Sequence, residues 1–220
     1  MSSASLLAAL QLGDSAFPSG AFTQSYGLET LVWEKAVFNA AGVEEVLAAH
    51  LRHRLARADL PALLAAHQAA AASDTDLVRQ IDDMLTATKM TREERQASQR
   101  VGARLIAEAK RLAPSPIFES GPCNGAVAFA LAGCAMGLDA RESATTYGYS
   151  FAAALVSAAM RLLRMGHGDA QSILRLSHAL IEQAVNEAET IRWAELCPFA
   201  PQLDLAIARH EHSQVRLFGS

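Results

Sequence analysis

Among the side chains of this sequence that could hold a metal, the seven histidines include two closely spaced pairs. His50 and His53 lie three residues apart and would share one face of a helix. A metal site needs at least three ligands with oriented outer partners. His67 is the only nearby candidate for a third ligand, and nothing in the sequence brings it to the pair. We therefore expect one partly buried and one solvated histidine here.

The second pair, His210 and His212, lies two residues apart near the C-terminus. On a helix these two side chains point about 200° apart. They would meet at a metal only in an extended segment or across the axis of a dimer. Transient binding of nickel or zinc at this pair stays open as an alternative to two histidines that hold no metal.

The sequence contains no motif for nucleophilic catalysis or phosphate binding. It has neither a G-x-x-x-x-G-K-[S/T] phosphate loop nor a G-x-S-x-G nucleophile turn. Asp82-Asp83 starts a DDxxT stretch, only half of the magnesium-binding DDxxD of helical prenyl-transfer enzymes. The three cysteines, Cys123, Cys134 and Cys197, form no CxxC pair and are expected as reduced thiols, mostly in the core. The sequence therefore predicts no catalytic residue, no cofactor and no resident metal.

Charged side chains are concentrated in one short stretch, Arg92-Glu93-Glu94-Arg95, which Arg100 follows. At helical spacing these residues could pair with one another three or four positions apart. Two interpretations stay open. The stretch is either a solvated face that stabilises its own helix, or a docking surface whose arginine forks meet the carboxylates of a partner.

Two further arginines, Arg161 and Arg164, stand in an otherwise apolar helical stretch. Such a side chain either extends its stem along the apolar surface toward solvent or is paired.

Composition predicts a folded, all-α protein. The chain has 220 residues, of which 51% are hydrophobic, 19% charged and 6% aromatic, so it is not a disordered chain. Strong helix formers dominate, whereas β-branched and aromatic residues are scarce. We expect a single-domain helical bundle, residues 1–220, of about nine to ten helices with a flexible C-terminal tail, residues 213–220.

Charge and hydropathy exclude several classes of partner. The net charge of −4 gives no electrostatic reason to bind nucleic acid or an anionic membrane. The N-terminus lacks the basic start of a secretory signal. The most apolar stretches, 125–138 and 151–160, are shorter than the roughly 18–20 residues that a membrane span requires. A cytoplasmic protein is expected.

Helical periodicity and turn residues place the elements along the chain. The first helix ends near Gly13, and the next follows the loop 13–20. Asp59 is expected as the N-cap of a helix restart, with Pro61 in its first turn. The predicted helices include residues 23 or 24 to about 37, 92–113, 124–138, 141–165, 170–189 and 203–212. The stretch 124–138 is apolar all round and is expected at the centre of the core.

In the order of the chain, several motifs closely resemble those of the UreF family. Residues 10–29, LQLGDSAFPSGAFTQSYGLE, match the opening of that family, with its P-x-G-x-F turn and S-x-GLE. Further matches follow in the order of the chain: Asp59-Leu60-Pro61, then the charged stretch, then the alanine-rich helix before residues 147–164. The endings ARHE at 208–211 and RLFGS at 216–220 also match. The resemblance covers essentially the whole chain.

The resemblance implies an all-α, dimeric protein without a catalytic site. It implies a cytoplasmic chaperone that joins the accessory protein UreD, also called UreH, and the GTPase UreG. That complex docks on apo-urease and helps deliver nickel to the urease active site. Within it, the UreF protein is expected to modulate GTP hydrolysis by UreG. The alternatives from the residues themselves are a helical metal-dependent enzyme that uses His50, His53 and an acid, and a generic helical adaptor.

The resemblance, with the turn and charge patterns, marks partner-binding candidates. The opening segment supplies Phe17, Pro18, Ser19, Gly20, Phe22, Tyr26 and Glu29, and we expect its rigid turn to project Phe17 and Phe22 as anchors. The charged stretch supplies Arg92, Glu94, Arg95 and Arg100. The C-terminal candidates, which the resemblance associates with UreD, are Arg209, His210, Arg216, Leu217, Phe218 and Ser220.

Arg161 falls on a position that many UreF proteins fill with lysine and that the resemblance associates with gating of the GTPase. Arginine keeps the charge but replaces a point charge by a planar fork. Ala21 likewise stands where many relatives have a second glycine.

Two structural alternatives stay open. The C-terminal tail either becomes ordered on binding a partner or packs on the core of its own chain. The small residues of Gly133-x-x-x-Gly137 permit a close approach of helices, either within the chain or between two copies.

Overall fold

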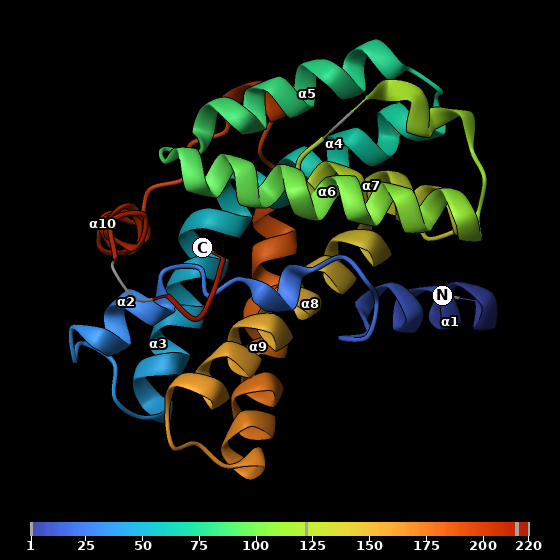
Figure 1. Cartoon of the computed structure of the whole chain (residues 1–220). Coiled ribbons are helices and arrows are strands. Elements are labelled where there is room, and N and C mark those ends of the chain that lie inside the picture. The colour runs from blue at the N-terminus through green and yellow to red at the C-terminus, as the bar shows by residue number, and fades with distance from the viewer. Residues whose placement is uncertain (1, 122, 214–215, 220) are drawn as a thin grey trace.

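The computed structural model describes residues 2–121, 123–213 and 216–219. The all-α prediction is confirmed, since these residues form helices joined by turns and contain no strand (Figure 1). The α-helices are α1 Ser3–Gly13, α2 Leu28–Trp33, α3 Ala40–His50, α4 Leu60–Ala71, α5 Thr75–Thr88, α6 Arg92–Leu112, α7 Gly125–Ala135, α8 Ala140–Leu162, α9 His167–Ala188 and α10 Pro201–His210. Short 3-10 turns cover Ala21–Thr23, Pro116–Ser120 and Trp193–Glu195.

The expected central helix is α7, whose first nine residues, 125–133, are all buried. It packs against α4, α6 and α8. At Gly133 a Cβ atom would lie only 2.3 Å from the Oγ of Ser143 on α8. Gly137 has a positive φ of 83° in the turn that follows α7. Both glycines of the G-x-x-x-G pattern therefore have a use within the chain.

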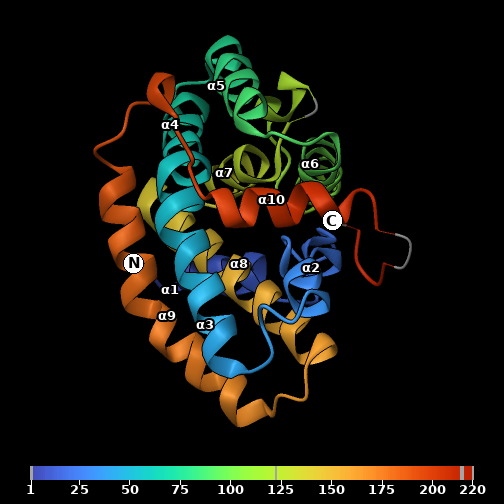
Figure 2. The ribbon, with the colours of Figure 1, turned by 90° about the vertical axis from the view of Figure 1, so that its left-hand side faces the viewer.

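A long helical rod runs through the molecule, because α3 continues into α4 through a π-helix, Leu51–Asp59 (Figure 2). As predicted, α4 begins at Leu60 with Pro61 in its first turn, but the helical path is not interrupted and the predicted side-chain cap at Asp59 is wrong. Asp59 has helical dihedral angles and caps nothing with its side chain, which instead accepts from Lys89 Nζ at 3.2 Å.

Proline explains the wider helical turn. Pro61 has no amide proton to donate to the carbonyl of Arg57, four residues before it. Two carbonyls of the widened segment accept from the connection before α10 instead. Cys197 N–H donates to Arg57 O and Phe199 N–H donates to His53 O, each at 3.1 Å. The π-helix thus fixes the path of the chain that leads into α10.

The helix predicted from residue 23 or 24 to about 37 is also wrong. A 3-10 turn covers 21–23, and α2 begins only at Leu28. Tyr26 and Gly27 adopt positive φ values of 53° and 83°, which interrupt any helix. A tertiary contact stabilises this turn, since Nε2 of the buried His50 donates to the carbonyl of Tyr26 at 3.0 Å.

The remaining boundaries follow local chemistry. The side chains of Asp74, Thr91 and Asp139 cap α5, α6 and α8, and the side chain of Asp169 accepts from Gly166 N–H at the start of α9. The helix expected over 92–113 ends at Leu112, before Pro114. Across the described residues, no helix has the length and apolar character that crossing a membrane requires.

Candidate functional site

The first and last segments of the chain meet at the carboxylate of Glu29, which is 1% exposed. Its Oε1 accepts from Leu217 N–H at 2.8 Å and from the Trp33 indole at 3.4 Å. Its Oε2 accepts from Phe218 N–H at 3.3 Å and from Nε2 of His210 at 2.9 Å. A single side chain on α2 therefore holds both the end of α10 and the tail.

A second carboxylate, Glu93 at the start of α6, faces the same histidine from the other side. Nδ1 of His210 lies 3.2 Å from Glu93 Oε1, and Arg216 Nη1 donates to the same oxygen at 3.1 Å. His210 and Glu93 are both buried, whereas Arg216 is exposed. We call these four residues, together with Arg161 at the end of α8, the tail clasp: Glu29, Glu93, Arg161, His210 and Arg216.

The electrostatics of Glu29 favour its ionised form. Burial by itself raises the pKa of this carboxyl. Hydrogen bonds from the Leu217 amide, His210 and Trp33 outweigh burial and lower the pKa below its ordinary value. Glu29 is therefore an anion at neutral pH, and the tail amides dock on a fixed negative charge.

Arg161, at the end of α8, joins the opening segment to the tail. Its Nη2 donates to the carbonyl of Phe22 at 2.6 Å, and its guanidinium lies 4.5 Å from the centre of the Phe218 ring. Gly219 N–H donates to Thr23 O at 2.9 Å beside them. Of the two open interpretations, pairing within the chain therefore describes Arg161, although its side chain, like that of Arg164, is exposed.

The flexible tail expected from the sequence is instead packed on the body at residues 216–219. Phe218 is 6% exposed, and its amide and that of Leu217 are both satisfied by Glu29. Residues 216–219 lie beside α2 (Figures 1 and 2). Ser220, also a predicted partner residue, lies outside the described residues, as do residues 214 and 215.

The opening turn presents one of its two aromatic rings. Phe22 is 48% exposed, whereas Phe17 is 8% exposed and packs in the core, so the expectation that Phe17 projects is wrong. Pro18 is exposed, and Gly20 is buried with a left-handed φ of 77°. Phe17 points inward and lines a small cavity that opens toward the segment after α1.

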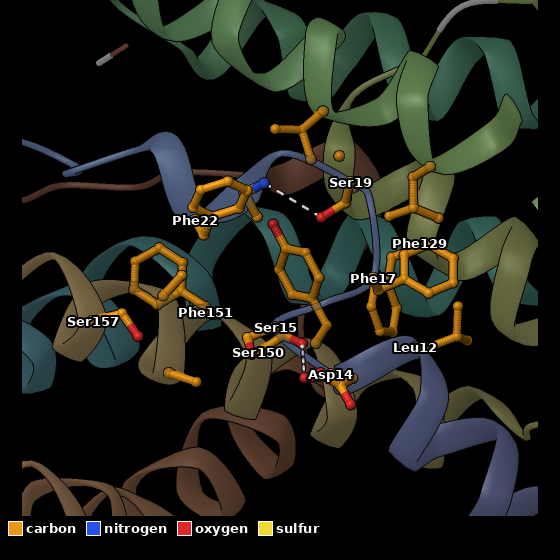
Figure 3. Close-up of a pocket in the computed structure, with 18 of the residues that line it drawn as sticks. Leu12, Asp14, Ser15, Phe17, Ser19, Phe22, Phe129, Ser150, Phe151 and Ser157 are labelled. Carbon is orange, nitrogen blue, oxygen red and sulfur yellow. Dashed lines mark hydrogen bonds between the residues drawn. The ribbon is translucent and has the colours of Figure 1, made fainter. Parts of the chain in front are cut away.

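That cavity, of about 80 Å³, is lined by Phe17, Tyr26, Phe129, Phe151 and neighbouring residues (Figure 3). Ser150 Oγ donates to the carbonyl of Gly13 at 3.3 Å at its edge. A space of this size holds a few water molecules rather than a substrate. Tyr26, one of the predicted partner residues, thus serves the interior of the fold.

The charged stretch of α6 makes contacts with distant segments. Arg54 forms partly buried ion pairs with Glu94 and with Asp204 of α10. Arg95 donates to the carbonyls of Lys89 and Met90 at 2.6 and 3.2 Å.

The other two arginines of the stretch lie at the surface. Arg92 pairs with Glu211 at 3.3 Å, and Arg100 is exposed. Arg209, another predicted partner residue, pairs with Glu34 at 3.1 Å on the surface. The stretch therefore ties α10 to the body through Glu94, and Arg100 lies exposed at the surface.

The histidines do not converge. His50 is 1% exposed and its Nε2 donates to Tyr26 O, whereas His53 is exposed. Burial lowers the pKa of His50 to about 3, which keeps it neutral. Nε2 of His67 donates to Leu138 O at 2.9 Å. Within the described part of the chain, no group of three His, Cys, Asp or Glu side chains could hold a metal ion.

Sequence reasoning missed several members of the site. Glu93 was assigned to the charged stretch but not to the tail, and Arg54 and Thr23 gave no local signal. The family resemblance did give a signal for two other members of the site. Its motifs include the GLE that contains Glu29 and the ARHE that contains His210. Nothing in the sequence indicated that these two motifs touch.

The fold and the site define an all-helical protein in which ionised side chains join the opening segment, the start of α6 and the C-terminal end. The UreF family model matches residues 37–178. Relatives named urease accessory protein UreF include those of Cupriavidus taiwanensis, 33% identical, covering 98% of this chain and 97% of the relative, and of Lachnoclostridium phytofermentans, 31% identical over 96% of both. That of a Bacillus species, strain TB-90, is 29% identical over 98% of this chain and 99% of the relative. The chain belongs to the UreF family.

Proposed function

We propose that this protein is a urease accessory chaperone that acts as a scaffold for nickel insertion. In this role residues 1–220 form one UreF-like domain that binds UreD (UreH) and the GTPase UreG, docks with them on apo-urease and modulates GTP hydrolysis in the cytoplasm. One observation carries the proposal. Three segments that the family resemblance marks as functional, around residues 22–29, 161 and 209–219, lie in mutual contact.

The surface beside the tail clasp has the chemistry of a partner contact. Phe22 and Leu217 are 48% and 67% exposed, and the Arg161 guanidinium lies between the opening segment and the tail. Aromatic and arginine side chains that are positioned by a rigid support are typical anchors of protein interfaces. We assign residues 213–220 and this surface to UreD.

We place the homodimer contact at a different face. Leu6, Leu7 and Leu10 of α1 are 46%, 66% and 62% exposed. An open groove of about 850 Å³ runs from α1 to α8 and α9, and Tyr149 and His178 line it. Exposed apolar side chains of this number on one face are typical of an interface. In a dimer, this apolar face of one copy would pack against the same apolar face of the other copy.

Two other functions compete with this proposal. A helical metal-dependent enzyme that uses His50 and His53 has no geometric support, since His50 already donates to Tyr26 O. Calorimetric titration of the isolated chain with nickel tests this alternative, because tight stoichiometric binding would favour it. A generic helical adaptor would not co-purify with urease subunits.

The test of the proposal is co-expression of the tagged chain with UreD, UreG and the urease subunits, followed by size-exclusion chromatography with light scattering. We expect one complex that contains all of them and two copies of this chain. Elution of the chain apart from both accessory proteins would contradict the proposal.

Arg161→Ala is expected to change the rate of GTP hydrolysis in the reconstituted complex without preventing assembly. The substitution removes a charge-assisted hydrogen bond to Phe22 O and the contact with the Phe218 ring. Such a bond contributes about 1.5 kcal/mol, which corresponds to roughly a tenfold change in rate if it acts on the transition state.

Arg164→Ala is the matched control, since Arg164 is exposed three residues further along. Phosphate release by complexes of equal composition is the measurement. An equal rate for Arg161→Ala and the unmodified complex would remove Arg161 from the functional surface.

A further inference from the structure

Acidic side chains are absent from three segments that come together around the exposed ring of Phe22. The opening segment 15–28, residues 95–107 of α6, and residues 157–168 at the end of α8 and beyond contain no aspartate or glutamate. These segments contain five arginines, although the whole chain has a net charge of −4. Positive charge is therefore concentrated in one part of an otherwise acidic molecule.

Two guanidinium groups flank the turn that carries Phe22, one from α6 and one from α8. Arg104 of α6 covers Gly20, where a Cβ atom would lie only 2.4 Å from Arg104 Nη1. Arg161 of α8 donates to Phe22 O at 2.6 Å, and its guanidinium lies 6.0 Å from the centre of the Phe22 ring. The opening segment passes between these two helices, which line one cavity with it (Figure 1). The exposed ring therefore has a positive charge on either side.

Two arginines on the outer face of α6 have charges that the chain does not compensate. Arg100 and Arg104 lie four residues apart, so they share one face of the helix, and both are exposed. Neither forms an ion pair among the described residues. Further along the same helix, by contrast, Lys110 and Arg111 pair with carboxylates at 3.0 and 2.9 Å. Carboxylates from another molecule would compensate both free charges and relieve their mutual repulsion.

The acidic residues nearest in sequence to these segments already have partners. Asp14 Oδ1 accepts from the backbone N–H of Ala16 at 2.8 Å. Glu108 accepts from Arg111, and the buried Glu29 accepts from the tail amides. The chain therefore supplies no adjacent free carboxylate for the arginines around Phe22.

Apolar side chains beside these arginines favour a protein partner over a polyphosphate. Phe22 and Leu217 are 48% and 67% exposed, and aromatic and arginine side chains together are typical of protein interfaces. The planar fork of arginine matches a carboxylate through two parallel hydrogen bonds. The net charge of −4 opposes the approach of nucleic acid and of an anionic membrane.

We propose that an acidic segment of a protein partner, with carboxylates on either side of an apolar side chain, binds the surface formed by Phe22, Arg100, Arg104 and Arg161. We call these four residues the arginine surface. The inference rests on the proposed function, which assigns UreD to the surface around Phe22. It extends that contact to α6 and specifies the chemistry of the partner.

The double variant Arg100→Glu/Arg104→Glu tests the proposal by reversing both free charges. Glutamate is about as good a helix former as arginine, and both positions are exposed, so the fold is kept. Each variant is co-expressed with tagged UreD, and the amount retained on immobilised UreD is measured as the salt concentration rises. We expect retention to fall by about tenfold or more, because the new carboxylates face those of the partner.

Lys110→Glu/Arg111→Glu is the matched control. It changes the charge of the same helix by the same amount at exposed positions, but these two cations already pair within the chain. Its retention should stay close to that of the unmodified chain. Circular dichroism of both double variants reports their helicity.

A cross-link provides a second measurement that does not depend on loss of binding. In Arg104→Lys, a zero-length carbodiimide joins the introduced amine to any carboxylate in contact with it, and mass spectrometry identifies the linked residue. We expect a link from position 104 to an aspartate or glutamate of UreD. The Lys110–Glu119 pair, at 3.0 Å, supplies the internal control link.

Four results would overturn the inference while leaving the proposed function in place. They are undiminished retention of Arg100→Glu/Arg104→Glu, an equal loss in the control variant, no link from position 104 to UreD when the control link forms, and binding of a mixed-sequence DNA duplex that the double reversal abolishes. A full chain that retains no UreD at all would contradict the proposed function and this inference with it.

Discussion

Replacing Glu29 by alanine is expected to lower the free energy of unfolding by about 3 to 5 kcal/mol, because each buried donor that loses its acceptor costs about 1 to 3 kcal/mol. The carboxylate accepts from two tail amides, one indole and one imidazole, and each of these donors loses its acceptor. Urea denaturation followed by far-ultraviolet circular dichroism measures the loss.

Glu34→Ala is the control for this substitution. Glu34 also pairs with a residue of α10, Arg209, but both side chains are largely exposed. An exposed pair contributes less than about 1 kcal/mol. If Glu29→Ala and Glu34→Ala lowered the free energy of unfolding equally, Glu29 would contribute no more than an exposed ion pair to joining the opening segment and the tail.

The contribution of Glu29 has a predictable dependence on pH. Its hydrogen bonds lower the pKa in the folded protein below the value of 4.5 that applies to the unfolded chain. Its stabilisation is therefore fully present above about pH 4.5 and is lost as the pH falls through the folded-state value. The difference in stability between the unmodified chain and Glu29→Ala should shrink as the pH falls below 4.5.

The second large effect is expected at Gly102, where α6 touches the chain that enters α7. A Cβ atom at this position would lie 1.9 Å from the carbonyl oxygen of Cys123 and 3.0 Å from the carbonyl carbon of Asn124. These are backbone atoms and cannot rotate away. Gly102→Ala is therefore expected to cost about 3 kcal/mol or more, at the upper end for overpacking.

The chain opposite Gly102 is held in place and cannot retreat. Asn124 N–H donates to Asp82 Oδ1 at 2.7 Å, and its side-chain amide donates to the same oxygen at 3.0 Å. Gly125 N–H donates to Ser98 Oγ at 3.2 Å. The close approach therefore fixes α6, which carries Glu93, relative to the central helix.

Gly168→Ala is the control for Gly102→Ala. Gly168 lies in the first turn of α9, and a Cβ atom there would have no neighbour within 4 Å. Alanine at such a helical position is neutral or stabilising by up to about 1 kcal/mol. Thermal unfolding of both variants decides the matter, and similar midpoints would contradict the packing argument.

Helix content could be predicted from the sequence because alanine and leucine periodicity acts locally. The buried centre over 125–133 follows from a stretch with no polar face. The two wrong expectations about helices, a helix from residue 23 or 24 to about 37 and an N-cap at Asp59, have one cause. In both places, residues distant in the sequence determine the local structure. His50 stabilises the left-handed turn at Tyr26, and the connection at Cys197 and Phe199 satisfies the carbonyls that the π-helix frees.

The candidate site was predicted in pieces but not as a whole. Family motifs supplied Glu29, Arg161 and His210 separately. The Glu29–His210 contact joins residues 181 positions apart, and no spacing along the chain encodes such a pairing. Phe17 was misplaced for a related reason, because a turn motif does not reveal that a cavity lies beneath it.

The central claim, that UreD docks on the C-terminal tail of this chain, is tested most directly by deletion of residues 215–220. The deletion removes Arg216, Leu217 and Phe218 but leaves every helix in place. Pull-down of co-expressed UreD is compared between the full chain and the chain truncated after residue 214, with circular dichroism on both. We predict unchanged helicity and no recovered UreD from the truncated chain. An undiminished yield of UreD from a folded, truncated chain would contradict the account.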